Sequence, residues 1–118
     1  MKKLLRLIPL IVIYFVIIYF SVKRPTGNSV SFLYADKIYH FGAYFTLGFV
    51  TFFSLSTKLS RRIFLIINML LGISLEIIQG TLPYRDMSFA DGVFNTLGLF
   101  LGAFVFSLLY KRIFKEVQ

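Results

Sequence analysis

The side chains of this sequence that could do chemistry lie in three short groups, each spaced like one face of a helix. In the first group Asp36, His40 and Tyr44 are four residues apart. Two later groups each pair an acid with an amide three or four residues further on. Residues at these spacings share a helix face, so each group predicts one polar stripe. With two flanking cations, the candidate ligand-binding residues are Asp36, Lys37, His40, Tyr44, Glu76, Gln79, Arg85, Asp91 and Asn95.

Two kinds of chemistry fit these residues. In an enzyme, His40 and Glu76 would be the catalytic candidates: His40 as a general base oriented by Asp36, and Glu76 as an acid or base. Arg85 would then stabilise developing negative charge. In a binding site, Arg85 and Lys37 would hold an anion while the carboxylates accept hydrogen bonds.

Simpler roles remain open for the same side chains. An acid in the first turn stabilises a helix by itself, which would account for Asp36 and Asp91. Gln79 and Asn95 are most simply hydrogen-bonding groups between helices, and Glu76 would pair with a cation as a structural lock.

Metal and cofactor chemistry are not expected from the spacing. Three carboxylates and His40 are suitable ligand types, but they match no dedicated metal motif, and Arg85 and Lys37 oppose a dication. The sequence has no cysteine, which excludes disulfides and cysteine-ligated metal. We predict no metal and no cofactor.

The elements that must position these residues are membrane helices. The chain has 118 residues, of which 58% are hydrophobic and 15% charged, against about 25% charged in soluble domains. The mean hydropathy is +0.80. A membrane-spanning helix needs about 20 apolar residues. One all-α domain, residues 1–118, is predicted, a bundle of four spans at about 4–22, 38–57, 63–82 and 92–110.

The basic residues predict the orientation of the bundle, because cytoplasmic loops of membrane proteins are rich in Lys and Arg. Both termini should be cytoplasmic, with the polar groups on the outer side. We therefore attribute the net charge of +8 to topology, and expect no nucleic-acid partner. The alternative that the first span is a cleaved signal peptide lacks a small-residue cleavage site. The inner side would hold Lys2, Lys3, Arg6, Lys58, Arg61, Arg62, Lys111, Arg112 and Lys115, with Lys58–Arg62 as a tight turn, and the outer side Lys23, Arg24, Lys37 and Arg85.

Three motifs carry a family resemblance. The segment 36–48, DKIYHFGAYFTLG, resembles the opening signature of the VanZ-like family. Residues 76–79, 83–85 and 91–98 resemble its second signature in the same order. The resemblance covers about 34–102. It implies a small multi-pass bacterial membrane protein and low-level resistance to teicoplanin, a lipidated glycopeptide that binds cell-wall precursors. It implies no catalytic residues.

The binding hypothesis leads. We expect a protein of the bacterial cytoplasmic membrane whose outer cleft binds a lipid-linked or phosphorylated head group. Membrane lipids, a lipid-linked cell-wall precursor or a lipoglycopeptide are the expected partners, and a homo-oligomer is open. An acid–base enzyme using His40 and Glu76 on a lipid-linked substrate is the alternative. A proton-carrying transporter is disfavoured, since the sequence has no inverted repeat.

Overall fold

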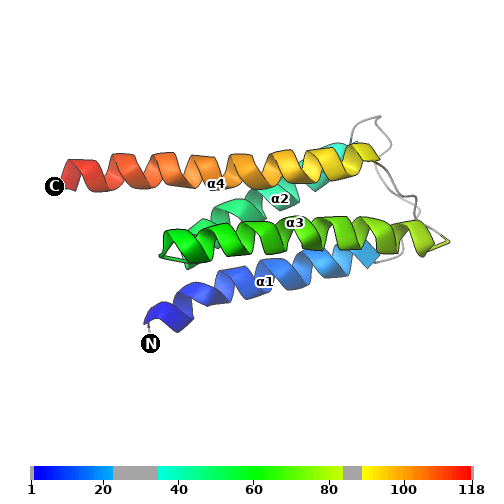
Figure 1. Cartoon of the computed structure of the whole chain (residues 1–118), viewed down its shortest axis with the longest axis horizontal. Helices are drawn as coiled ribbons and strands as arrows, with labels where there is room; N and C mark the ends of the chain where they lie inside the picture. The colour runs from blue at the N-terminus through cyan, green and yellow to red at the C-terminus, as the bar shows by residue number, and fades with distance from the viewer. Residues whose placement is uncertain (1, 23–34, 84–88, 118) are drawn as a thin grey trace.

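Four α-helices make up the part of the chain that the structure, a computed structural model, describes: residues 2–22, 35–83 and 89–117. No strand occurs in these ranges, so the all-helical prediction is confirmed. Successive helices run in opposite directions along the bundle, and the N- and C-termini lie at the same end (Figure 1). The helices are α1 (Lys2–Val22), α2 (Ala35–Ser54), α3 (Lys58–Thr81) and α4 (Phe89–Val117).

Several helix boundaries differ from the predicted spans. Helix α2 ends at Ser54 rather than at residue 57, because Thr57 is the N-cap of the next helix. The Thr57 hydroxyl oxygen accepts a hydrogen bond from the Ser60 backbone N–H at 3.1 Å, a standard N-cap. The segment 58–62 is therefore the first turn of α3 rather than a turn between helices. Helix α4 continues past residue 110 to Val117, because its basic tail contains no helix breaker.

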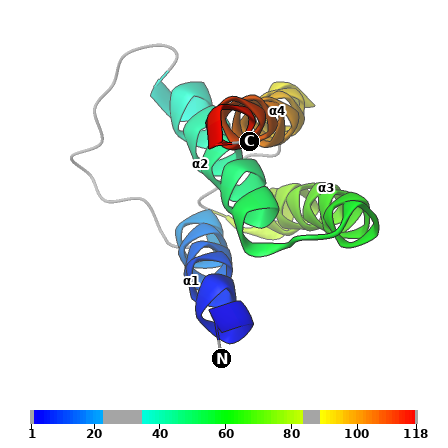
Figure 2. The same cartoon turned by 90° about the vertical axis from the view of Figure 1, so that its left-hand side faces the viewer.

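Helix α2 is the central element of the bundle. Both α2 and α3 contact all three other helices, but α2 packs much more extensively, chiefly against α4. Within the described residues, α1 and α4 make no mutual contact. Figure 2 shows α1 and α4 on different sides of α2, with α3 beside it. The core combines residues from every helix, so α1 is an integral part of the fold. The buried apolar core consists of Leu10, Ile17, Tyr44, Leu47, Leu75 and Leu99.

Glycines bring α2 and α4 into backbone contact. A Cβ on Gly48 would overlap the Leu99 carbonyl oxygen, and a Cβ on Gly102 would overlap that of Phe45. Gly98 meets the Phe41 carbonyl in the same way. Small residues that allow such close approach are typical of helix pairs in membranes. Gly98 and Gly102, which are four residues apart, therefore form a packing surface of α4 against α2.

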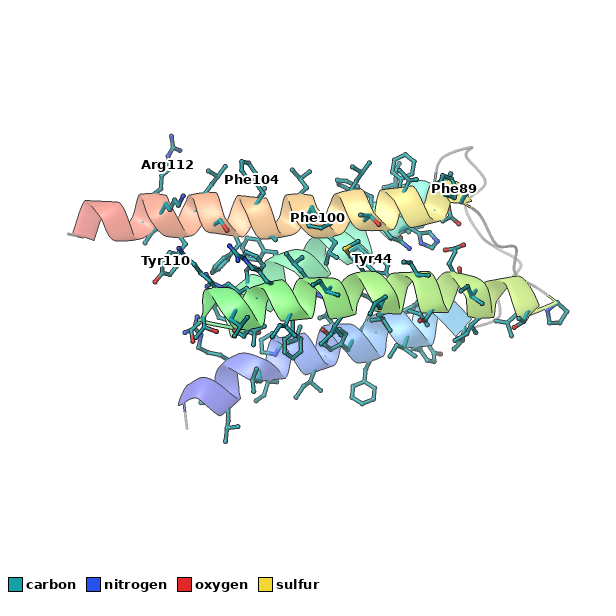
Figure 3. All side chains as sticks on the ribbon, viewed as in Figure 1. Tyr44, Phe89, Phe100, Phe104, Tyr110 and Arg112 are labelled. Carbon is teal, nitrogen blue, oxygen red and sulfur yellow. The ribbon has the colours of Figure 1, made fainter. Side chains whose placement is uncertain are left out.

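Three of the helices are long and apolar enough to cross a membrane: Leu4–Val22, Lys58–Thr81 and Phe89–Ile113. Helix α2 is also 20 residues long but less apolar, because Lys37, His40 and two tyrosines lie in its first half. The surface of the bundle that faces away from its core is apolar. Phe104 is 58% exposed and points away from the other helices, whereas Tyr44 lies between them (Figure 3).

We expect Gly48→Ala to destabilise the bundle by about 1–3 kcal/mol, because a methyl group there forces α2 and α4 apart. The check is thermal unfolding of the purified protein in detergent. Gly42→Ala on the same helix is the matched control, since nothing lies within 4 Å of a Cβ at that position. Equal melting temperatures for the two variants would contradict the close contact.

Candidate functional site

Three ionisable side chains from three helices converge at the end of the bundle where α2 and α4 begin and α3 ends (Figure 1). His40 lies in the second turn of α2, Asp91 in the first turn of α4, and Glu76 five residues before the end of α3. One ligand atom of each lies within 4.8 Å of the others. We call His40, Glu76 and Asp91 the polar cluster.

The side chains of the polar cluster are largely buried. Glu76 is 6% exposed and Asp91 is 4% exposed, and the His40 side chain is 15% exposed. Carboxylates are almost never this buried unless they are paired or bind something. This degree of burial distinguishes the cluster from an ordinary solvated helix end.

Asn95 orients the His40 ring. The His40 Nδ1 and the Asn95 Oδ1 are 3.0 Å apart, and because an amide oxygen only accepts, Nδ1 donates. The other ring nitrogen, Nε2, lies 3.6 Å from Asp91 Oδ2. Asp91 and Asn95 are one turn apart on α4, so the same face of α4 lies against both nitrogens of the His40 ring.

The glycine contact makes this arrangement possible. Gly98 follows Asn95 by three residues, and its backbone meets the carbonyl of Phe41, the residue after His40. A short imidazole and a short amide bridge two helices only where their backbones approach this closely. The close packing of α2 against α4 at Gly98 therefore allows the contact between His40 and Asn95.

A small pocket lies one turn deeper than the cluster. It has a volume of about 20 Å³, which is room for roughly one water molecule. Tyr44 and Asn95 line it on one side and Asn68 and Gly72 on the other. The Tyr44 ring packs against Gly72 and is 4% exposed, so Tyr44 forms the floor of the site rather than its mouth.

Gln79 lies outside the cluster. Its Nε2 donates to the backbone carbonyl of Ser21 at 2.9 Å, which ties the end of α3 to the end of α1. Gln79 and Asn95 thus both make the interhelical hydrogen bonds that the sequence favours for them. Only Asn95 does so at the cluster.

A second buried polar group, in the middle of the bundle, was missed by the sequence analysis. The Tyr14 hydroxyl donates to Asn68 Oδ1, and Asn68 Nδ2 donates to Thr51 Oγ1 at 2.9 Å. Asn68 and Thr51 are fully buried. The available signal was Asn68 itself, an amide in the centre of an apolar span and on the same helix face as Gly72 and Glu76.

Three predicted site residues lack a described side chain. Asp36 and Lys37 belong to the first turn of α2, but their side chains lie outside the described part of the structure, and Arg85 lies outside the described residues altogether. The proposed orientation of His40 by Asp36 is therefore untested. Among the residues with described side chains, Asn95 and Asp91 face the ring.

A comparison with protein families matches the family model described as VanZ/LLP1 to residues 2–110. The chain belongs to the VanZ family. The match begins before the motifs at 34–102 and includes α1, which agrees with the core residues and the Tyr14 hydrogen bond that α1 contributes. The comparisons with curated proteins and with solved structures give no match.

The VanZ-family protein has a single histidine, so ring ¹⁵N chemical shifts report on His40 alone. We expect the neutral ring to carry its proton on Nδ1, because Asn95 Oδ1 accepts from that atom. Asn95→Ala should remove the preference for this tautomer. Gln79→Ala, which removes a different interhelical hydrogen bond, is the control and should leave the spectrum unchanged. A proton on Nε2 in the wild type would contradict the assigned hydrogen bond.

Proposed function

We propose that this VanZ-family protein is a multi-pass protein of the bacterial cytoplasmic membrane, with both termini in the cytoplasm and the polar cluster on the outer side. The charge distribution supports this orientation. Arg6 and Arg61 lie at the end of the bundle that carries the termini, and Glu76 and Asp91 lie at the other end. An excess of Lys and Arg marks the cytoplasmic side.

The path of the chain supports α2 as the fourth span. Helix α1 ends at the outer end of the bundle and α3 begins at the cytoplasmic end, so α2 has to run the length of the bundle between them. Its 20 residues correspond to about 30 Å, the thickness of the hydrocarbon core. His40 lies in the polar first half of α2, and its side chain faces Asp91 and Asn95 on α4 rather than lipid.

We infer that the polar cluster and Asn95 bind the polar head of a lipid-linked molecule of the cell envelope. The observation that carries this proposal is that His40, Glu76 and Asp91 lie together, largely buried, at one end of an apolar bundle. Ionisable groups at such positions are costly and mark ligand or ion sites. Carboxylate and amide oxygens accept hydrogen bonds from sugar hydroxyls and peptide amides, while Lys37 and Arg85 are the proposed partners of a phosphate.

Reduced susceptibility to teicoplanin is the cellular activity that we propose for this site. Membership in the VanZ family supports it, since low-level teicoplanin resistance is the founding activity of that family. A protein that binds the head of a lipid-linked precursor would alter its display at the membrane surface. It could equally prevent the lipid tail of the antibiotic from anchoring beside its target.

We expect the wild-type protein to give a low-level rise in teicoplanin resistance, without a rise for vancomycin, in a sensitive Gram-positive host. Glu76→Gln and His40→Ala should return susceptibility to that of the empty vector at matched membrane expression. Glu116→Gln is the matched control, because it removes the same charge from the last turn of α4, about 37 Å along the helix from Asp91. Equal resistance with Glu76→Gln and the wild type would exclude the cluster, and no rise with any protein would exclude this activity.

An acid–base enzyme is the second candidate function. The specific observation in its favour is that Asn95 holds His40 in one orientation while Glu76 lies in the same cluster. A positioned imidazole beside a carboxylate is a general acid–base pair.

Lipid co-purification separates the enzyme from the binding protein. The double variant with His40→Asn and Glu76→Gln should lose activity in either case. An enzyme that uses these residues for proton transfer should still co-purify with its lipid-linked substrate, because the two substitutions keep polar groups of similar size. A binding protein should lose the lipid as well. A double variant with full activity would rule out the acid–base mechanism.

A further inference from the structure

We propose that the polar cluster of His40, Glu76 and Asp91 is a binding site for a divalent transition-metal cation of the Zn²⁺ type. This inference reverses the expectation drawn from the sequence, which found no metal motif. Motifs are recognised when ligands are close in sequence, whereas these three come from three separate helices. The proposal rests on the donor atoms, their separations and the orientation of the imidazole.

The donor set fits a zinc-type cation. One imidazole nitrogen and two carboxylates are all established zinc ligands, and the imidazole disfavours Mg²⁺ and Ca²⁺, which prefer oxygen ligands. Glu76 and Asp91 are both buried, so their carboxylate oxygens are shielded from bulk water. Three protein ligands with one open position are typical of zinc sites that also hold water or a substrate.

The separations are close to those of a metal site. Ligand atoms about 2.1 Å from a tetrahedral cation lie about 3.4 Å from one another. His40 Nε2 and Asp91 Oδ2 are 3.6 Å apart, which is too long for a good hydrogen bond but near this value. The three ligand atoms lie within 4.8 Å of one another, so the widest separation has to shorten by up to about 1.4 Å. A small side-chain rotation is sufficient for this.

Asn95 supplies the supporting hydrogen bond that a metal-binding histidine needs. A histidine ligand almost always donates its other ring N–H to an oxygen, which fixes the tautomer and the ring orientation. Here Nδ1 lies 3.0 Å from Asn95 Oδ1, and this leaves Nε2 directed at the Asp91 carboxylate. The ring is therefore already oriented for a cation held between Nε2 and that carboxylate.

The position of the cluster allows a cation to enter and to meet a ligand. His40 is within two turns and Asp91 within one turn of the start of its helix, and the His40 side chain remains partly exposed. A bound dication would neutralise the Glu76 and Asp91 carboxylates, and its open coordination position would accept an anionic ligand. This would deepen the proposed function, because a phosphorylated head group could then coordinate the cation directly.

The test is metal binding by the full-length protein, purified in detergent with an affinity tag free of histidine and stripped with a chelator. We expect one Zn²⁺ per chain by elemental analysis after re-addition and desalting, and a shift of the His40 Nε2 resonance in the ¹⁵N spectrum. His40→Ala, Glu76→Gln and Asp91→Asn should each lower the affinity at least tenfold, because the loss of even an outer-shell partner typically costs a metal site about 10–100-fold. Glu116→Gln should bind like the wild type. A parallel titration with Mg²⁺ tests the selectivity that the imidazole predicts.

A wild-type protein that binds no metal would overturn the proposal, for instance because a basic side chain occupies the cluster instead. Binding unaffected by His40→Ala, or binding of Mg²⁺ in preference to Zn²⁺, would overturn it as well. Each variant is compared only if it elutes as a monodisperse species, and His40→Gln replaces a variant that does not fold. Metal binding without cluster-dependent teicoplanin resistance would support the site and reject the proposed function, whereas resistance without metal would do the reverse.

Discussion

The rest of this structure depends on the backbone contact between α2 and α4. At Gly48, Gly98 and Gly102 the two helices approach so closely that a methyl group would overlap a carbonyl oxygen of the neighbouring helix. In an apolar solvent there is little hydrophobic gain from bringing two apolar helices together, so close packing has to supply the attraction. The same approach distance lets His40 on α2 reach Asn95 and Asp91 on α4. Stability and site geometry therefore share one cause.

Buried polar side chains lie at two depths in the bundle, and the cost of burying them is offset in a different way at each depth. Tyr14, Asn68 and Thr51 form a chain of hydrogen bonds across three helices in the middle of the bundle. In a membrane-like interior such bonds are worth about 0.6–1.7 kcal/mol each. This chain orients α1 against α2 and α3. At the end of the bundle where α2 and α4 begin, the cluster of His40, Glu76 and Asp91 combines ionisable groups, which neutral hydrogen bonds alone compensate poorly.

Two arginine side chains bind the carbonyl oxygens at the C-terminal end of α2. Arg61 donates to the carbonyl oxygens of Phe52 and Leu55, both at 2.9 Å, and Arg6 donates to that of Phe53 at 2.7 Å. These carbonyls belong to the last turn of α2 or to the residue after it, and they have no partner within the helix. Cations at this end also interact favourably with the helix dipole. The central helix is thus held by basic side chains at one end and by the His40–Asn95 contact at the other.

The sequence by itself determined the helices and their polar faces, because spacing along one helix is a local property. It also contained the family motifs, and the VanZ assignment follows from them and from the match to residues 2–110. It failed for the first turn of α3, where basic residues were read as a turn although Thr57 caps a helix there. Only the tertiary structure decided which polar groups meet: Asn95 reaches His40, whereas Gln79 binds the carbonyl of Ser21 instead. It also decided that His40, Glu76 and Asp91 form one cluster. The physical reason is that these partners lie on different helices, so their distances depend on how closely and in which rotation the helices pack, and no spacing along a single helix contains that information.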